Sequence, residues 1–97
     1  MTWLVQMLLP VAGRQKTYDS ITRELTERFG GATAYSRAPA AGLWKNPSDR
    51  TERDDIIVVE VMVERVDRKW WGAFRRRLEK RLRQKEIVVR AHEIRTL

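Results

Sequence analysis

The sequence predicts an α+β domain in which four antiparallel strands form one sheet and two helices cover one face of it. Two kinds of pattern predict this class. Strands are indicated where apolar residues alternate, and helices are indicated where apolar residues recur every three or four positions. The chain has 97 residues, which is enough for one domain with a single modest core.

The most strand-like run covers residues 54–64 and is rich in β-branched residues. Four odd-numbered residues of this run are apolar and share one face of the strand: Ile57, Val59, Val61 and Val63. The other face carries Ile56, Val58 and Met62, with the carboxylate of Glu60 between them. This run is therefore expected to be a central strand.

Two further runs, residues 2–10 and 86–97, alternate in the same way. Residues 32–37 are expected to form a fourth strand, which the proline-containing residues 38–42 interrupt, so that it is an edge strand or a bulged one. Residues 43–45 are expected to resume it before a turn at residues 46–49.

The first helix is predicted over residues 18–29, where one apolar stripe recurs at offsets of three and four. Thr17 or Asp19 is the expected N-terminal cap, and Gly30 is expected to end the helix. The second helix is predicted over residues 67–84, with Asp67 as its cap.

The net charge of +7 comes from one segment. Residues 67–85 hold nine Lys/Arg against two acidic residues, and the remainder holds eleven of each kind. Most of these cations lie off the apolar stripe of the second helix, where a solvated surface is the ordinary interpretation. The candidates for contact with a polyanion are Arg75, Arg76, Lys80 and Arg83.

The element order is βαββαβ. Two strand–helix–strand units with right-handed crossovers form one sheet in the order 4-1-3-2, with both helices on one face. This topology resembles the ferredoxin-like sandwich. The resemblance covers nearly the whole chain and implies no particular activity, because the architecture serves many unrelated functions.

The sheet face away from the helices is called the open face. It would carry Leu4, Gln6, Leu8, Ile56, Val58, Glu60, Met62, Val88, Arg90, His92 and Ile94. A face in water is ordinarily mostly polar, whereas this one is mostly apolar. We therefore expect a second copy of the chain to cover it, which gives a homodimer.

Four polar residues stand out on the open face: Gln6, Glu60, Arg90 and His92. If the hairpin has no bulge, Lys45 pairs with Arg50, Tyr35 falls opposite Glu60, and Arg37 shares their face; one bulged residue would reverse this. One interpretation is a buried polar network in which Glu60 pairs with Arg90 or Arg37. The other is a ligand pocket, with Glu60 or His92 as proton carrier and Tyr35 and Arg37 as orienting groups.

The Met-Leu-Leu-Pro run at residues 7–10, together with the topology, is similar to the dimeric α+β-barrel proteins. That resemblance implies a ligand chamber on the inner sheet face, as in small monooxygenases and muconolactone-isomerase-like proteins, but no catalytic motif of theirs maps onto this chain. The chain also looks similar to small uncharacterised bacterial proteins that share Phe-Gly-Gly (residues 29–31) and Trp70-Trp71.

The composition excludes several classes of site. The chain has no cysteine and one histidine, so disulfides, thiolate metal sites and multi-histidine metal sites are excluded. No cofactor motif is present, no membrane partner is expected, and a cytoplasmic location is expected. RNA binding on the sheet is not favoured, because the open face has Met62 and Val58 where stacking aromatics are usual.

Three functions follow as hypotheses. The first is a homodimeric module, structural or binding a small ligand through the open face. The second is a small dimeric α+β-barrel enzyme acting on an aromatic or carbonyl compound without a metal, and the third is binding of nucleic acid or an acidic partner through the second helix.

Overall fold

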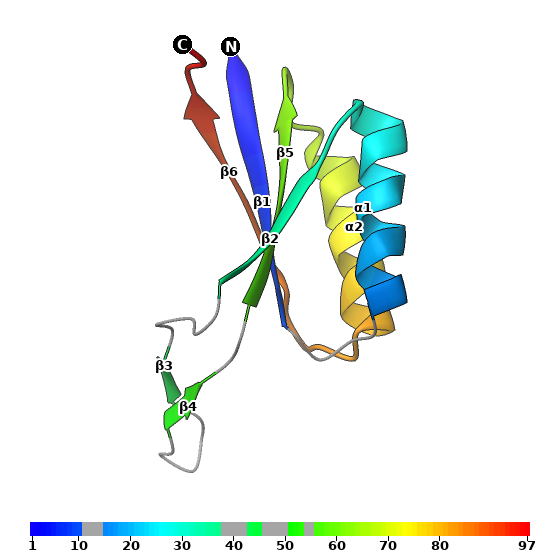
Figure 1. Cartoon of the computed structure of the whole chain (residues 1–97), viewed down its shortest axis with the longest axis vertical. Coiled ribbons are helices and arrows are strands. Elements are labelled where there is room, and N and C mark those ends of the chain that lie inside the picture. The colour runs from blue at the N-terminus through cyan, green and yellow to red at the C-terminus, as the bar shows by residue number, and fades with distance from the viewer. Residues whose placement is uncertain (11–14, 38–42, 46–50, 54–55) are drawn as a thin grey trace.

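The computed structural model describes residues 1–10, 15–37, 43–45, 51–53 and 56–97. It has a four-stranded antiparallel sheet, two helices against one face of that sheet, and a separate two-stranded hairpin (Figure 1). The elements in chain order are β1 (Thr2–Pro10), α1 (Gln15–Phe29), β2 (Thr33–Arg37), β3 (Leu43–Lys45), β4 (Thr51–Arg53), β5 (Ile56–Val63), α2 (Arg68–Arg81) and β6 (Val88–Ile94).

The strands of the main sheet lie in the order β2-β5-β1-β6. If these four strands are numbered one to four along the chain, the observed order is 2-3-1-4. Read from the opposite edge of the sheet, this is the predicted order 4-1-3-2. The strand that contains Glu60 is central, as its composition indicated, and it pairs with β1 over the whole of its length. The class and the strand order predicted from the sequence are therefore confirmed.

The predicted register of β2 is wrong by two residues. Thr33, and not Tyr35, lies opposite Glu60, while Tyr35 lies opposite Val58. In the hairpin Lys45 pairs with Thr51, and not with Arg50. Five residues (38–42) connect β2 to β3 whereas two (54–55) connect β4 to β5, so equal spacing along the two strands was the wrong assumption. A shift of two residues preserves the face, because side chains alternate with a period of two.

The hydrophobic core fills the space between the helices and the inner sheet face. The sequence predicts two helix stripes of four apolar residues each, and six of the eight are buried: Tyr18, Ile21 and Leu25 from α1, and Trp71, Phe74 and Leu78 from α2. The last residue of each stripe, Phe29 and Leu82, is only half-buried. The six buried residues pack on Val5, Met7, Leu9, Val59, Val61, Val63 and Ile87. The hydroxyl of Tyr18 donates a hydrogen bond to the carbonyl of Pro10, which ties α1 to the end of β1.

The ends of the helices agree with the sequence only in part. Asp67 caps α2, since its carboxylate accepts a hydrogen bond from the backbone N–H of Trp70 at 3.1 Å. This helix ends at Arg81, earlier than predicted, and Arg83 has a left-handed φ of 54°. Neither predicted cap of α1 is correct, because the helix begins at Gln15 and includes both Thr17 and Asp19.

An aromatic cluster joins the end of α1 to the beginning of α2. Phe29 stacks on Trp71, with ring centroids 5.1 Å apart, and meets Trp70 edge to face at 5.1 Å. The guanidinium of Arg28 lies 4.5 Å from the centre of the Trp70 ring. Gly30 ends α1 as predicted, with a φ of 86° that glycine adopts without strain.

Candidate functional site

A chain of hydrogen bonds crosses three strands on the open face. Gln6 on β1 lies opposite Glu60 on β5 and opposite Arg90 on β6. Its amide Nε2 donates to Oε2 of Glu60 at 2.5 Å, and its Oε1 accepts from Nε of Arg90 at 3.1 Å. These three residues, which we call the polar chain, are the centre of the cluster predicted from the sequence.

The polar chain differs from the predicted direct pairing of Glu60 with Arg90. The Gln6 amide stands between the two charges, with its donor end at the carboxylate and its acceptor end at the guanidinium. Each hydrogen bond therefore has one charged partner, and such bonds are shorter and stronger than neutral ones. Opposite charges at the two ends also hold the amide in one orientation, so the arrangement has a fixed polarity across the sheet.

Apolar side chains surround the polar chain, and several are open to solvent. Met62 is 58% exposed, Val88 41% and Tyr35 39%. Leu4 and Leu8 on β1 are half-buried. A contiguous apolar surface on a single domain ordinarily marks an interface or a binding site.

Of the other predicted site residues, His92 and Tyr35 stay apart from the polar chain. His92 is exposed and lies opposite Leu4, one pair of residues further along β1 than Arg90. Tyr35 shares the open face but lies opposite Val58. Within the described residues neither side chain is hydrogen-bonded to Glu60 or Gln6. The backbone of Arg37 lies opposite Ile56, and the side chain of Arg37 is outside the part of the chain that the structure describes.

The cations of α2 and of the turn after it separate into two sets. Arg76, Lys80 and Arg83 are exposed, as a polyanion contact requires. Arg75 is half-buried, and its Nε is enclosed. Arg77 pairs with Glu24 of α1 at 3.0 Å on the surface. Only the first set therefore remains available as the predicted polyanion surface.

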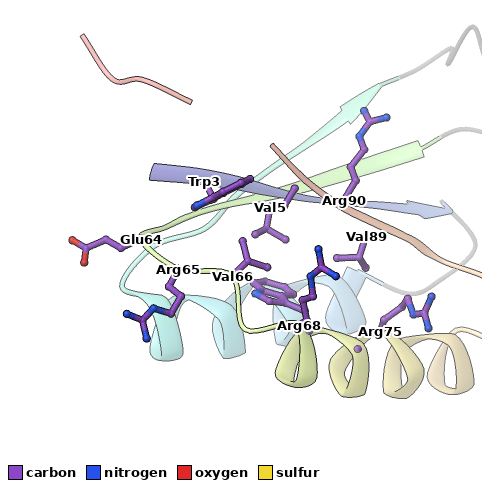
Figure 2. Close-up of a pocket in the computed structure, with 12 residues that line it drawn as sticks. Trp3, Val5, Glu64, Arg65, Val66, Arg68, Arg75, Val89 and Arg90 are labelled. Atoms are coloured by element: carbon purple, nitrogen blue, oxygen red, sulfur yellow. The ribbon is translucent and has the colours of Figure 1, made fainter. Parts of the chain in front are cut away.

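A second site, which the sequence did not predict, lies between α2 and the β1–β6 edge of the sheet (Figure 2). This α2 pocket has a volume of about 650 Å³. Trp3, Val5, Glu64, Arg65, Val66, Arg68, Trp71, Gly72, Arg75, Val89, Arg90 and Ala91 line it. The sequence feature that could have predicted this pocket is the spacing of Arg68, Gly72 and Arg75. Offsets of four and three place two cations on one helix face, with a glycine that has no side chain between them.

Two surveys of the described part of the chain are negative. No group of three or more His, Asp or Glu residues there could hold a metal ion. None of the helices there is long and apolar enough to cross a membrane.

Comparison with known proteins relates this chain to others by fold alone. No family model matches the sequence, and no curated protein matches it. A solved structure of a phage SAM lyase in complex with S-methyl-5'-thioadenosine superimposes with a TM-score of 0.66 at 12% sequence identity. The match covers 95% of this chain and 81% of the lyase. At that identity the likeness establishes a shared α+β architecture.

Proposed function

We propose that this protein is a cytoplasmic, ferredoxin-like module that forms a homodimer through its open face and holds a small ligand there. The polar chain carries the proposal. It is an oriented, charge-assisted network at the centre of a surface whose other described members are mostly apolar. The cysteine-free sequence suits a reducing compartment.

A second copy is the occupant that best accounts for the exposed apolar residues. A twofold dimer uses the same patch on both subunits, so each Met62 and Val88 would be covered by the equivalent face of the partner. Removing apolar surface from water stabilises such a contact by roughly 25 cal/mol for each Å² buried. The polar chain would then restrict the orientation of the two sheets, because charged groups taken from water must keep their partners.

Light scattering after size exclusion, over a series of protein concentrations, tests the dimer. We expect the wild type to be dimeric and Met62→Glu to be monomeric, because this substitution places a charge on the exposed apolar surface. Ala73→Glu is the matched control, since it adds the same charge at an exposed position of α2. A wild type that stays monomeric throughout, or equal dissociation of both variants, would overturn the proposal.

A small dimeric α+β-barrel enzyme is the alternative, with Glu60 moving a proton at an aromatic or carbonyl substrate. The half-buried carboxylate next to a fixed amide donor favours it. SAM and S-methyl-5'-thioadenosine are suitable first probes, because the solved neighbour is named for the former and was captured with the latter. If the wild type turns over SAM and Glu60→Gln does not, the result supports this alternative. If Glu60→Gln still turns over SAM, Glu60 is not the proton carrier.

Polyanion binding through α2 is the third candidate. Arg76 and Lys80 are exposed one turn apart on α2. Arg83, also exposed, follows in the turn after the helix. Retention on a heparin column that falls after charge reversal at Arg76 and Lys80 would support it. Retention that is unchanged in that double variant would exclude this surface.

A further inference from the structure

The α2 pocket exists because α2 leaves part of the inner sheet face uncovered. Ala91 of β6 alternates in phase with Ile87, the buried residue just before this strand, yet Ala91 is exposed. Trp3, at the adjoining end of β1, is also only partly buried. The pocket of about 650 Å³ occupies this space, which is within the ordinary range for small-molecule sites.

The walls of the pocket combine apolar and cationic groups. Trp3, Val66 and Val89 supply apolar surface. Figure 2 shows the side chains of Arg68 and Arg75 leaving α2 on the side that faces the strands. Pockets that orient a small molecule ordinarily pair a mostly apolar lining with a few placed polar groups.

The other charged residues that line the pocket are directed away from it. Glu64 and Arg65 point away from the pocket, and Arg90 extends on the far side of the sheet from α2 (Figure 2). Glu79, four residues after Arg75, accepts a hydrogen bond from the backbone N–H of Ile87 at 2.9 Å. Among the charged residues that line the pocket, Arg68 and Arg75 are therefore the ones directed toward it.

Two buried donors at the pocket have no partner. Trp71 is 5% exposed and lines the pocket. Its Nε1 and the Nε of Arg75 are both enclosed, and neither donates a hydrogen bond within the part of the chain described. Both nitrogens are closed off by surrounding protein atoms, so an acceptor would reach either of them only after neighbouring side chains move.

Gly72 keeps the floor of the pocket open. It lies between Arg68 and Arg75 on the same helix face, where glycine disfavours the helix. A Cβ at this position would meet only Nη1 of Arg76, at an ordinary contact distance of 3.5 Å. Close packing therefore does not require glycine here, and its effect is the space it leaves.

We propose that the α2 pocket binds a small organic anion, in which a carboxylate or phosphate is attached to a flat apolar body. The anionic group is held between Arg68 and Arg75, whose guanidinium groups can each donate two parallel hydrogen bonds. The apolar body lies against Trp3 and Val66, close to the ring of Trp71. This site is separate from the open face and does not depend on the dimer.

The experiment follows the indole N–H resonances by NMR while four probes are added to the wild-type protein. The probes are 1-naphthoate, 1-naphthyl phosphate, the neutral 1-naphthalenemethanol, and inorganic phosphate. The resonance missing in Trp71→Phe identifies Trp71. We expect its signal to shift and saturate on addition of one or both naphthyl anions. The difference in affinity between 1-naphthoate and 1-naphthyl phosphate shows whether the site prefers a carboxylate or a phosphate. With 1-naphthalenemethanol and with inorganic phosphate we expect at least about tenfold weaker binding.

Substitutions identify the site. Arg68→Gln and Arg75→Gln should each weaken the preferred naphthyl anion about tenfold, as the loss of a charged hydrogen bond predicts. Arg81→Gln removes the same charge from an exposed position on α2 and should leave the affinity unchanged. Gly72→Ala should weaken binding while raising the melting temperature, which separates a filled pocket from a damaged fold.

Three results would overturn the proposal. The first is equal affinity for 1-naphthalenemethanol and the naphthyl anions, because the arginines would then contribute nothing. The second is equal weakening by Arg81→Gln and Arg68→Gln, which would indicate a general effect of charge. The third is a Trp71 signal that none of the probes moves.

Discussion

Replacing Gln6 with methionine breaks both hydrogen bonds of the polar chain while keeping the length of the side chain. The bond from Gln6 to Glu60 has a charged acceptor, and such bonds contribute about 1.5–3 kcal/mol. Both partners are half-buried and Arg90 is exposed, so the low end of that range applies. We expect Gln6→Met to lower the free energy of unfolding by about 1–2 kcal/mol.

The double variant Gln6→Met/Glu60→Met separates this bond from other effects of the substitutions. With both partners apolar, no polar group of the pair is left without its partner, and such replacements are often close to neutral. The double variant should therefore be more stable than the sum of the single changes predicts, by a coupling energy of about 1–2 kcal/mol. Urea unfolding followed by tryptophan fluorescence measures each species, at two protein concentrations so that any dimer contribution is seen.

The chain contains a control pair of the same chemistry. Nε2 of Gln15 donates to Oδ1 of Asp19 at 3.0 Å, but this pair is exposed on α1. Its double-variant cycle should show little coupling, because water replaces the lost bond. If the Gln6–Glu60 cycle is additive within about 0.5 kcal/mol, or no larger than the control, the polar chain is only a surface contact and the reasoning fails.

Four further predictions concern stability, measured by urea or thermal unfolding. Asp67→Ala should cost about 1 kcal/mol, because the N–H of Trp70 loses its cap. Arg83→Gly should stabilise by about 1 kcal/mol, since glycine adopts the left-handed φ of 54° without strain. Phe74→Ala should cost about 3–5 kcal/mol, because the ring is fully buried among aromatic neighbours. Gly72→Ala should add about 1 kcal/mol, because helix propensity improves and the new methyl meets no clash.

The alternation of residues along β1 and β5 was sufficient to predict the centre of the polar chain. Each strand has one polar residue amid its apolar positions on the open face, Gln6 and Glu60. In an antiparallel pair with both apolar faces aligned, few registers are allowed, and the observed one places these two opposite each other. The amide relay to Arg90 was not predictable, because sequence shows which residues share a face and not which side chain stands between two charges.

Other features depend on information that periodicity does not contain. Which residue lies opposite Tyr35 depends on the lengths of two connections, the one from β2 to β3 and the one from β4 to β5. These connections have five and two residues, and the sequence pattern does not reveal that difference. The α2 pocket depends on how far α2 extends over β6. Ala91 alternates with the open-face residues Arg90 and His92, so the sequence places it on the inner face, where it lines the pocket. Whether a helix covers that position is decided by the packing angle of the whole helix.

Arg90 shows that the two proposed sites lie back to back across one edge strand. Neighbouring residues of a strand face opposite sides, so Val89 and Ala91 line the α2 pocket while Arg90 donates to Gln6 on the open face. A ligand that displaces β6 must therefore also displace one end of the polar chain, and any coupling between the two sites is reciprocal. Gln6→Met alters the polar chain and Arg68→Gln alters the pocket. A change at either site in the variant of the other therefore measures whether β6 couples them.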